Sequence, residues 1–90
     1  MPLFAVICTD RPDSQETRAA NRDAHLSYLY ETGVVSQAGP FLNHKGDMKG
    51  SLIILDVADL TAAELWAADD PYAKAGLFSS VKIDEWKKVI

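Results

Sequence analysis

The sequence predicts an α+β fold in which strands and helices follow the order β-α-β-β-α-β. Three observations lead to this prediction. Two short apolar runs read as buried strands, two longer segments carry the spacing and end signals of helices, and glycine or proline separates most of them. The chain has 90 residues, of which 48% are hydrophobic and 24% charged, so we expect a single globular domain over residues 1–90.

The first strand and the first helix have clear signals. Residues 3–8 are apolar without interruption, which is typical of a strand buried on both faces and therefore central in its sheet. Residues 12–32 then read as a helix, with acidic residues near its positive end and Gly33 behind its last turn. The apolar stripe expected to face the sheet comprises Ala19, Leu26, Leu29 and Tyr30.

A hairpin is predicted in the middle of the chain. Residues 34–42 read as an edge strand that is broken at Gly39-Pro40, because proline is confined to the edges, ends and bulges of sheets. Residues 43–50 form a polar turn with two glycines, and residues 51–57 form the next buried strand. The turn therefore joins two antiparallel neighbours.

The last third of the chain contains one more helix and one more strand. Thr61 and Glu64 have the spacing of a capping box, which predicts a helix over residues 62–68. Residues 72–77 read as a loop or a single turn. Residues 78–89 alternate between apolar and charged side chains, as a half-exposed final strand does.

This order of elements predicts the ferredoxin-like sandwich. Right-handed crossovers and one hairpin reduce the choices to a four-stranded antiparallel sheet with both helices on one face. The other face is then bare, and the two uninterrupted apolar strands indicate that it is apolar. We therefore expect two copies of the chain to form a homodimer through their open sheet faces.

Composition excludes several classes of function. A net charge of −4 without a dense basic cluster argues against nucleic acid as a partner. The apolar runs are far shorter than the roughly 20 residues that cross a bilayer. The N-terminus lacks the features of an export signal, and the lone Cys8 suits a reducing compartment, so a cytoplasmic location is expected. His25 and His44 are far apart in the chain and no cysteine pair exists, so no metal site or cofactor is predicted.

The candidate chemistry lies on the two helices. If they run antiparallel across the sheet, His25 of the first and Asp70 at the end of the second come within reach of each other. A carboxylate that accepts from one imidazole nitrogen fixes the tautomer and raises the basicity of the other nitrogen. Arg22 lies on the same side of the helix as His25 and could bind an anionic group of a substrate.

Five short motifs occur along the chain in a fixed order. They are Arg22-x-x-His25-Leu26, Ala38-Gly39-Pro40, Gly50 at a strand start, Ala68-Asp69-Asp70-Pro71-Tyr72 with Ala75-Gly76-Leu77-Phe78, and Lys87-Lys88-Val89. Together they resemble the YciI-like, or YCII-related, proteins over nearly the whole chain. The resemblance implies a ferredoxin-like dimer of the dimeric α-β barrel type, with an active site centred on His25 and Asp70.

The leading hypothesis is a cofactor-independent acid-base enzyme that abstracts a proton from a small molecule, as lyases and isomerases do. His25 is the expected general base, Asp70 orients it, and Arg22 holds an anionic or enolic oxygen. Tyr72 and Ser36 are further candidates for substrate contacts. The alternative is a dimeric small-ligand-binding or accessory protein in which these polar residues form a structural network. A third interpretation, cofactor-independent oxygenation, rests only on analogy with the fold.

Overall fold

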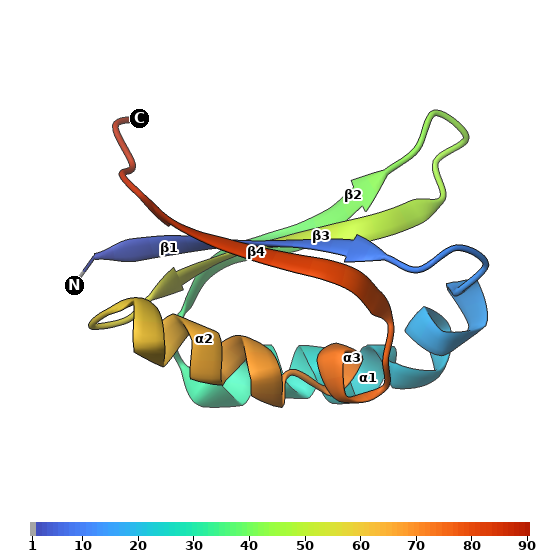
Figure 1. Ribbon diagram of the computed structural model, residues 1–90, viewed down its shortest axis with the longest axis horizontal. Coiled ribbons are helices and arrows are strands. Elements are labelled where there is room, and N and C mark those ends of the chain that lie inside the picture. Colours follow the sequence, from blue (N-terminus) through green and yellow to red (C-terminus); the bar gives the residue numbers. More distant parts are fainter. Residues whose placement is uncertain (1) are drawn as a thin grey trace.

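The computed structural model describes residues 2–90 and confirms the ferredoxin-like fold. Four strands form one antiparallel sheet in the order β2-β3-β1-β4, and the helices lie together on one face of it (Figure 1). The elements are β1 (Leu3–Asp10), α1 (Gln15–Thr32), β2 (Val35–Leu42), β3 (Met48–Asp56), α2 (Leu60–Asp69), α3 (Pro71–Lys74) and β4 (Phe78–Trp86).

The two apolar strands are central and the hairpin partner is an edge, as predicted. β1 pairs with both β3 and β4, and β2 pairs only with β3. The predicted break at Gly39-Pro40 is wrong, because Gly39 pairs with Leu52 and Pro40 pairs with Ser51 in a continuous register. An edge strand tolerates proline where its N–H side needs no partner, and the register shifts lie nearer the two ends of β2 instead.

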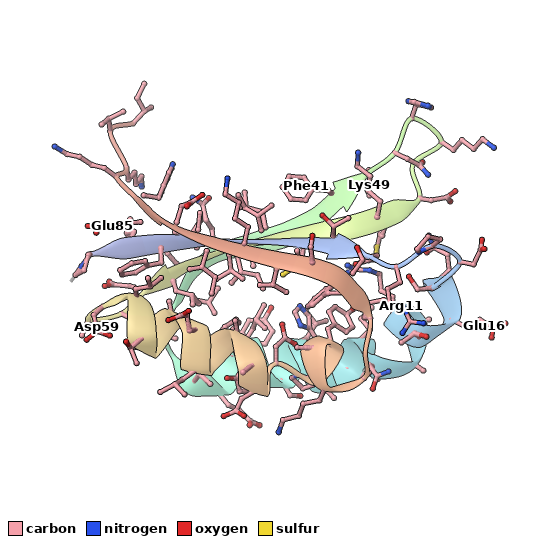
Figure 2. The ribbon with its side chains drawn as sticks, in the orientation of Figure 1. Arg11, Glu16, Phe41, Lys49, Asp59 and Glu85 are labelled. Carbon is pink, nitrogen blue, oxygen red and sulfur yellow. The ribbon has the colours of Figure 1, made fainter. Side chains whose placement is uncertain are left out.

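The two faces of the sheet differ in what covers them. Side chains alternate along a strand, so Phe4, Val6 and Cys8 point into the core under the helices. Ala5 and Ile7 point to the opposite face, where they line an open hollow with Trp86. Figure 2 shows the labelled Phe41 on this second face, away from the helices. We call this surface the bare face; the residues that line its hollow are Ala5, Ile7, Gln37, Ala38, Gly39, Pro40, Phe41, Leu52, Ile54 and Trp86.

The buried face of α1 differs from the predicted apolar stripe. Leu29 is buried as expected, but Ala19 is exposed and Tyr30 is 83% exposed. Arg18 and His25 are buried in their place, with only 5% and 6% of their surface exposed. A charged or polar side chain can be buried when it is hydrogen bonded, and both residues find acidic partners on other elements.

The second helix begins earlier than predicted, and its cap is a different residue. Asp59 is the N-cap of α2, and its side chain accepts from the backbone N–H of Ala62, so the Thr61–Glu64 capping box does not form. The Tyr28 hydroxyl donates to the Trp66 carbonyl at 2.7 Å, which joins α1 to α2. Within residues 2–90, no helix combines the length and the apolar character that crossing a membrane requires.

Candidate active site

A cavity of about 240 Å³ lies between α1 and the edge of the sheet formed by β2 and β3. Its wall is largely apolar, with a few polar side chains that converge on it, as ligand sites commonly have. The residues that line it come from α1 (Arg18, Arg22, His25, Leu26, Leu29), from β2 (Ala38, Gly39, Pro40), from β3 (Met48, Ser51, Ile53) and from α3 (Tyr72).

His25 and Asp70 meet in the wall of this cavity. Nδ1 of His25 lies 2.7 Å from Oδ1 of Asp70, and Asp70 is only 1% exposed. The same oxygen accepts the backbone N–H of Tyr72 at 2.9 Å, because Asp70 is the N-cap of α3. A carboxylate can only accept, so Nδ1 carries a proton, and in the neutral imidazole Nε2 then has a free lone pair. The short α3 therefore holds the carboxyl group that sets the histidine tautomer.

The ring of Tyr72 holds the imidazole of His25 in place. The two rings stack with centroids 3.9 Å apart and an interplanar angle of 13°. Phe78 supports Tyr72 from its edge at 6.1 Å. Burial raises the pKa of Tyr72, and the positive charges of Arg18 and Arg22 offset only part of that rise, so the phenol stays protonated.

Arg18 is a buried guanidinium that the sequence alone did not mark as a candidate site residue. It donates to both carboxylate oxygens of Asp10 at 2.8 Å, to Oγ of Ser51 at 3.1 Å, and its Cζ lies 4.8 Å from the ring centre of Tyr72. Burial alone would lower the pKa of Arg18, but the hydrogen-bonded Asp10 raises it overall. The signal that could have found Arg18 is its spacing of seven residues, two helical turns, before His25.

Two polar atoms of this group are open to the cavity. Every fully buried side-chain nitrogen or oxygen in residues 2–90 has a hydrogen-bond partner. Nε2 of His25 has no such partner among these residues, and the hydroxyl of Tyr72 accepts from Arg18 and keeps its own O–H to donate in the cavity that both His25 and Tyr72 line. A base and a neutral hydroxyl donor therefore face the same space.

Arg22 and Ser36 lie in different surroundings. Arg22 is exposed at the mouth of the cavity, one helical turn before His25, and forms no ion pair with the side chains of residues 2–90. Ser36 is exposed and lines a neighbouring hollow beside Leu26 and Leu29, not the cavity of His25. The fold thus groups Arg22, His25, Asp70 and Tyr72, and leaves Ser36 outside the group.

Cys8 lies in the core near these charged groups and remains a thiol. Burial raises its pKa to about 12, and the negative charges of Asp70 and Asp10 add to the rise. A thiol with such a pKa is a poor nucleophile at neutral pH, so Cys8 behaves as a small buried apolar residue. In residues 2–90, no three His, Cys, Asp or Glu side chains gather as metal ligands would.

Comparison with known proteins assigns the chain to a family. The model of the YCII-related domain matches residues 2–87. The chain belongs to the YCII-related domain family. Among its curated relatives, Protein YciI of Escherichia coli O6:H1 is 35% identical over 97% of this chain and 98% of the relative. A Haemophilus influenzae protein is 32% identical over 96% of this chain and 97% of the relative.

Solved structures of a similar chain and of more distant chains share the fold. A similar structure is 5-chloro-2-hydroxyhydroquinone dehydrochlorinase, TftG, from Burkholderia phenoliruptrix AC1100, solved in complex with 2,5-dihydroxybenzoquinone. It is 33% identical, with a TM-score of 0.85, and the match covers 94% of this chain and 93% of that chain. An antibiotic biosynthesis monooxygenase matches with a TM-score of 0.62 at 10% identity, which shows a common fold alone.

Proposed function

We propose that this protein is a cofactor-independent acid-base enzyme that removes a proton and a leaving group from a small ring compound. The observation that carries the proposal is His25, whose Nδ1 is bound to the buried Asp70 while its Nε2 is open to a small cavity. A similar chain, TftG, is a dehydrochlorinase, and its complex contains a single-ring quinone. Both facts favour elimination chemistry on a molecule of that size.

In the proposed reaction, His25 is the general base. In the keto tautomer of the substrate the chlorine-bearing ring carbon is tetrahedral. Nε2 takes the proton of a ring hydroxyl, the freed electron pair shifts through the ring to form a new π bond to that carbon, and chloride departs with the electrons of its own bond. Asp70 keeps the imidazole in the reactive tautomer and stabilises the imidazolium that forms. Arg22, exposed at the mouth and unpaired among residues 2–90, is proposed to attract the anionic substrate.

Chloride release from 5-chloro-2-hydroxyhydroquinone tests the proposal. His25→Gln is expected to lower the rate by about 10²–10⁴-fold, because the base is lost. His44→Gln is the matched control, since His44 is exposed in the turn between β2 and β3, and it should retain the wild-type rate. Full activity in His25→Gln would refute the proposal.

Asp70→Asn separates the charge of Asp70 from its part in folding. The Asn oxygen can still accept the N–H of Tyr72, so the cap of α3 survives. The same oxygen accepts from Nδ1 of His25, so the tautomer is kept, but the neutral amide no longer supplies the negative charge that stabilises the imidazolium. We expect chloride release to fall about 100-fold or more with a small change in melting temperature.

The alternative proposal is a non-catalytic protein that binds a small ligand. It is favoured by the hydrogen bonding of the buried network, since every fully buried side-chain nitrogen and oxygen of residues 2–90 already has a partner. A purely structural network predicts that Asp70→Asn lowers the melting temperature by several degrees and leaves ligand affinity unchanged.

We also propose that two copies pair through the bare face. Apolar side chains surround a hollow of about 550 Å³ there, and no helix of the same chain covers it (Figure 1). Large exposed apolar patches on soluble proteins commonly mark interfaces. The C-terminal residues Val89 and Ile90 are also exposed, and the end of the chain rises on this side of the sheet (Figure 1).

A further inference from the structure

Arg18 has more hydrogen-bond donors than its protein partners use. Its Nε–H and the two N–H bonds of Nη2 are directed to Asp10 and Ser51. The side chain also donates to the hydroxyl of Tyr72, so four of its five N–H bonds are used and one is left, although only 5% of the residue's surface is exposed. Arg18 is one of the residues that line the cavity, where a remaining donor is available to a ligand. The guanidinium of Arg18 is thus fixed by its protein partners and still has a donor for a ligand.

We propose that Nη1 of Arg18 and the hydroxyl of Tyr72 form an oxyanion site that binds one negatively charged oxygen of a single-ring phenolate or enolate. The two groups are neighbours, since Cζ of Arg18 lies 4.8 Å from the ring centre of Tyr72. The side chain of Arg18 also donates to the hydroxyl of Tyr72, which keeps its own O–H to donate, and both residues line the same cavity. The inference rests on the proposed function in taking this cavity as the substrate site.

The charges around the cavity select an anion. No Asp or Glu of residues 2–90 lines it, because Asp10 and Asp70 lie behind Arg18 and His25 as their partners. Arg22 at the mouth adds a positive charge that is not paired within the described residues. The chain as a whole carries a net charge of −4, so the cavity with its arginines is a positively charged region of an acidic protein. Anions are therefore drawn to the cavity and not to the surface at large.

The size of the cavity restricts the ligand to one ring. A volume of about 240 Å³ exceeds the roughly 150 Å³ that encloses benzene and falls below the roughly 300 Å³ at which drug-sized sites begin. Leu26, Leu29 and Ile53 supply apolar contacts for the ring. With its oxygen fixed by Arg18 and Tyr72, a phenolate or enolate would be held beside Nε2 of His25, and the site would stabilise charge that develops on that oxygen.

The test measures binding of 4-nitrophenolate in alkaline buffer. Neutral 4-nitroanisole, which has the same ring without the charged oxygen, is the control compound. The variant is the double substitution Arg18→Gln with Asp10→Asn, which removes both charges together and keeps an amide pair in the place of the ion pair. A single substitution would leave a buried charge without its partner. We expect the double variant to bind 4-nitrophenolate at least about tenfold more weakly, with an altered absorption band, and to bind 4-nitroanisole as before.

Several outcomes would overturn the oxyanion site. It fails if wild-type protein binds the two probes equally, or if the folded double variant keeps wild-type affinity for 4-nitrophenolate. Should the double variant not fold, Tyr72→Phe decides the matter, because it keeps the ring stacked on His25 and removes only the hydroxyl donor. Unchanged affinity and an unchanged absorption band in Tyr72→Phe would then contradict the inference.

The same titration distinguishes this inference from the proposed reaction. Absence of chloride release in the wild-type protein, together with binding that depends on Arg18, would refute the reaction and leave the oxyanion site standing.

Discussion

The two faces of the sheet differ in which side chains they bury and which they leave exposed. Under the helices, the apolar core contains two acid-base pairs, Arg18 with Asp10 and His25 with Asp70, each nearly inaccessible to solvent. On the bare face, apolar residues such as Phe41 and Trp86 remain 37% and 38% exposed. Charged pairs are thus buried on the face that the helices cover, and apolar side chains are exposed on the bare face.

The contrast indicates that the two faces have different tasks. Burying a charged pair costs desolvation free energy, and such pairs are retained where their chemistry or geometry is useful. Leaving apolar surface in water is also unfavourable, and association removes that cost. We therefore propose that binding and chemistry belong to the helix-covered face and assembly to the bare face. Three predictions test this division, from the largest effect to the smallest.

The largest effect is expected from Gly50→Ala in the centre of the sheet. A Cβ at Gly50 would collide with the backbone carbonyl oxygen of Cys8 on the neighbouring strand. The free energy of unfolding should fall by about 3 kcal/mol or more, because neither backbone can move without breaking the β1–β3 ladder.

Gly39→Ala on the edge strand is the control for this collision. A Cβ at Gly39 meets no atom within 4 Å, and its stability should stay within about 0.5 kcal/mol of wild type. Urea titration measures both variants. Equal losses of stability in the two would contradict the view that the edge strand borders open space while the centre of the sheet is closely packed.

Assembly should respond to a charge on the bare face. Leu52→Lys places an ammonium group in the hollow beside Ile7 and Trp86. The fold should survive, since the side chain can reach water in the free chain, but pairing would bury the charge without a partner. Sedimentation is expected to give 9.9 kDa for the variant and twice that mass for wild type.

Glu64→Lys is the control for assembly, because it changes charge on the exposed side of α2 and should keep the wild-type mass. A wild-type protein that sediments as a monomer at micromolar concentration would refute the dimer. The proposals for the cavity would be unaffected, since all of their residues come from one chain.

The smallest effect concerns alkaline stability under the helices. The Cys8 thiol has a pKa near 9.0 when unfolded and about 12 in the folded protein. Between these values the unfolded chain loses a proton that the folded chain keeps, so the free energy of unfolding falls as the pH rises. Cys8→Ala should show a shallower fall over this interval in pH-dependent urea unfolding. Parallel curves for the two proteins would mean that Cys8 is not shielded from water.

The sequence was sufficient to predict the fold because the signals concerned are local. Uninterrupted apolar runs in residues 3–8 and 51–57 marked the central strands, and Gly33 marked the end of α1, where it adopts the left-handed conformation. The pairing of His25 with Asp70 also followed from the expected antiparallel helices, and the two side chains meet at 2.7 Å. Their part in catalysis remains a proposal.

The buried face of α1 could not be predicted from its own residues. Apolar spacing favoured Ala19 and Tyr30, and both lie exposed. Arg18 is buried because Asp10 and Ser51, on two different strands, converge on its guanidinium. A helix read alone shows which side chains are apolar and does not show which polar ones will find a partner.

The sequence by itself determined the order of the elements, the central and edge strands, and the residues that could carry proton transfer. These follow from side-chain pattern, turn residues and helix ends, which act over a few neighbouring positions. Only the tertiary structure decided that Arg18 belongs to the site and that Ser36 does not line its cavity. The physical reason is that the burial of a charge depends on partners brought from distant parts of the chain.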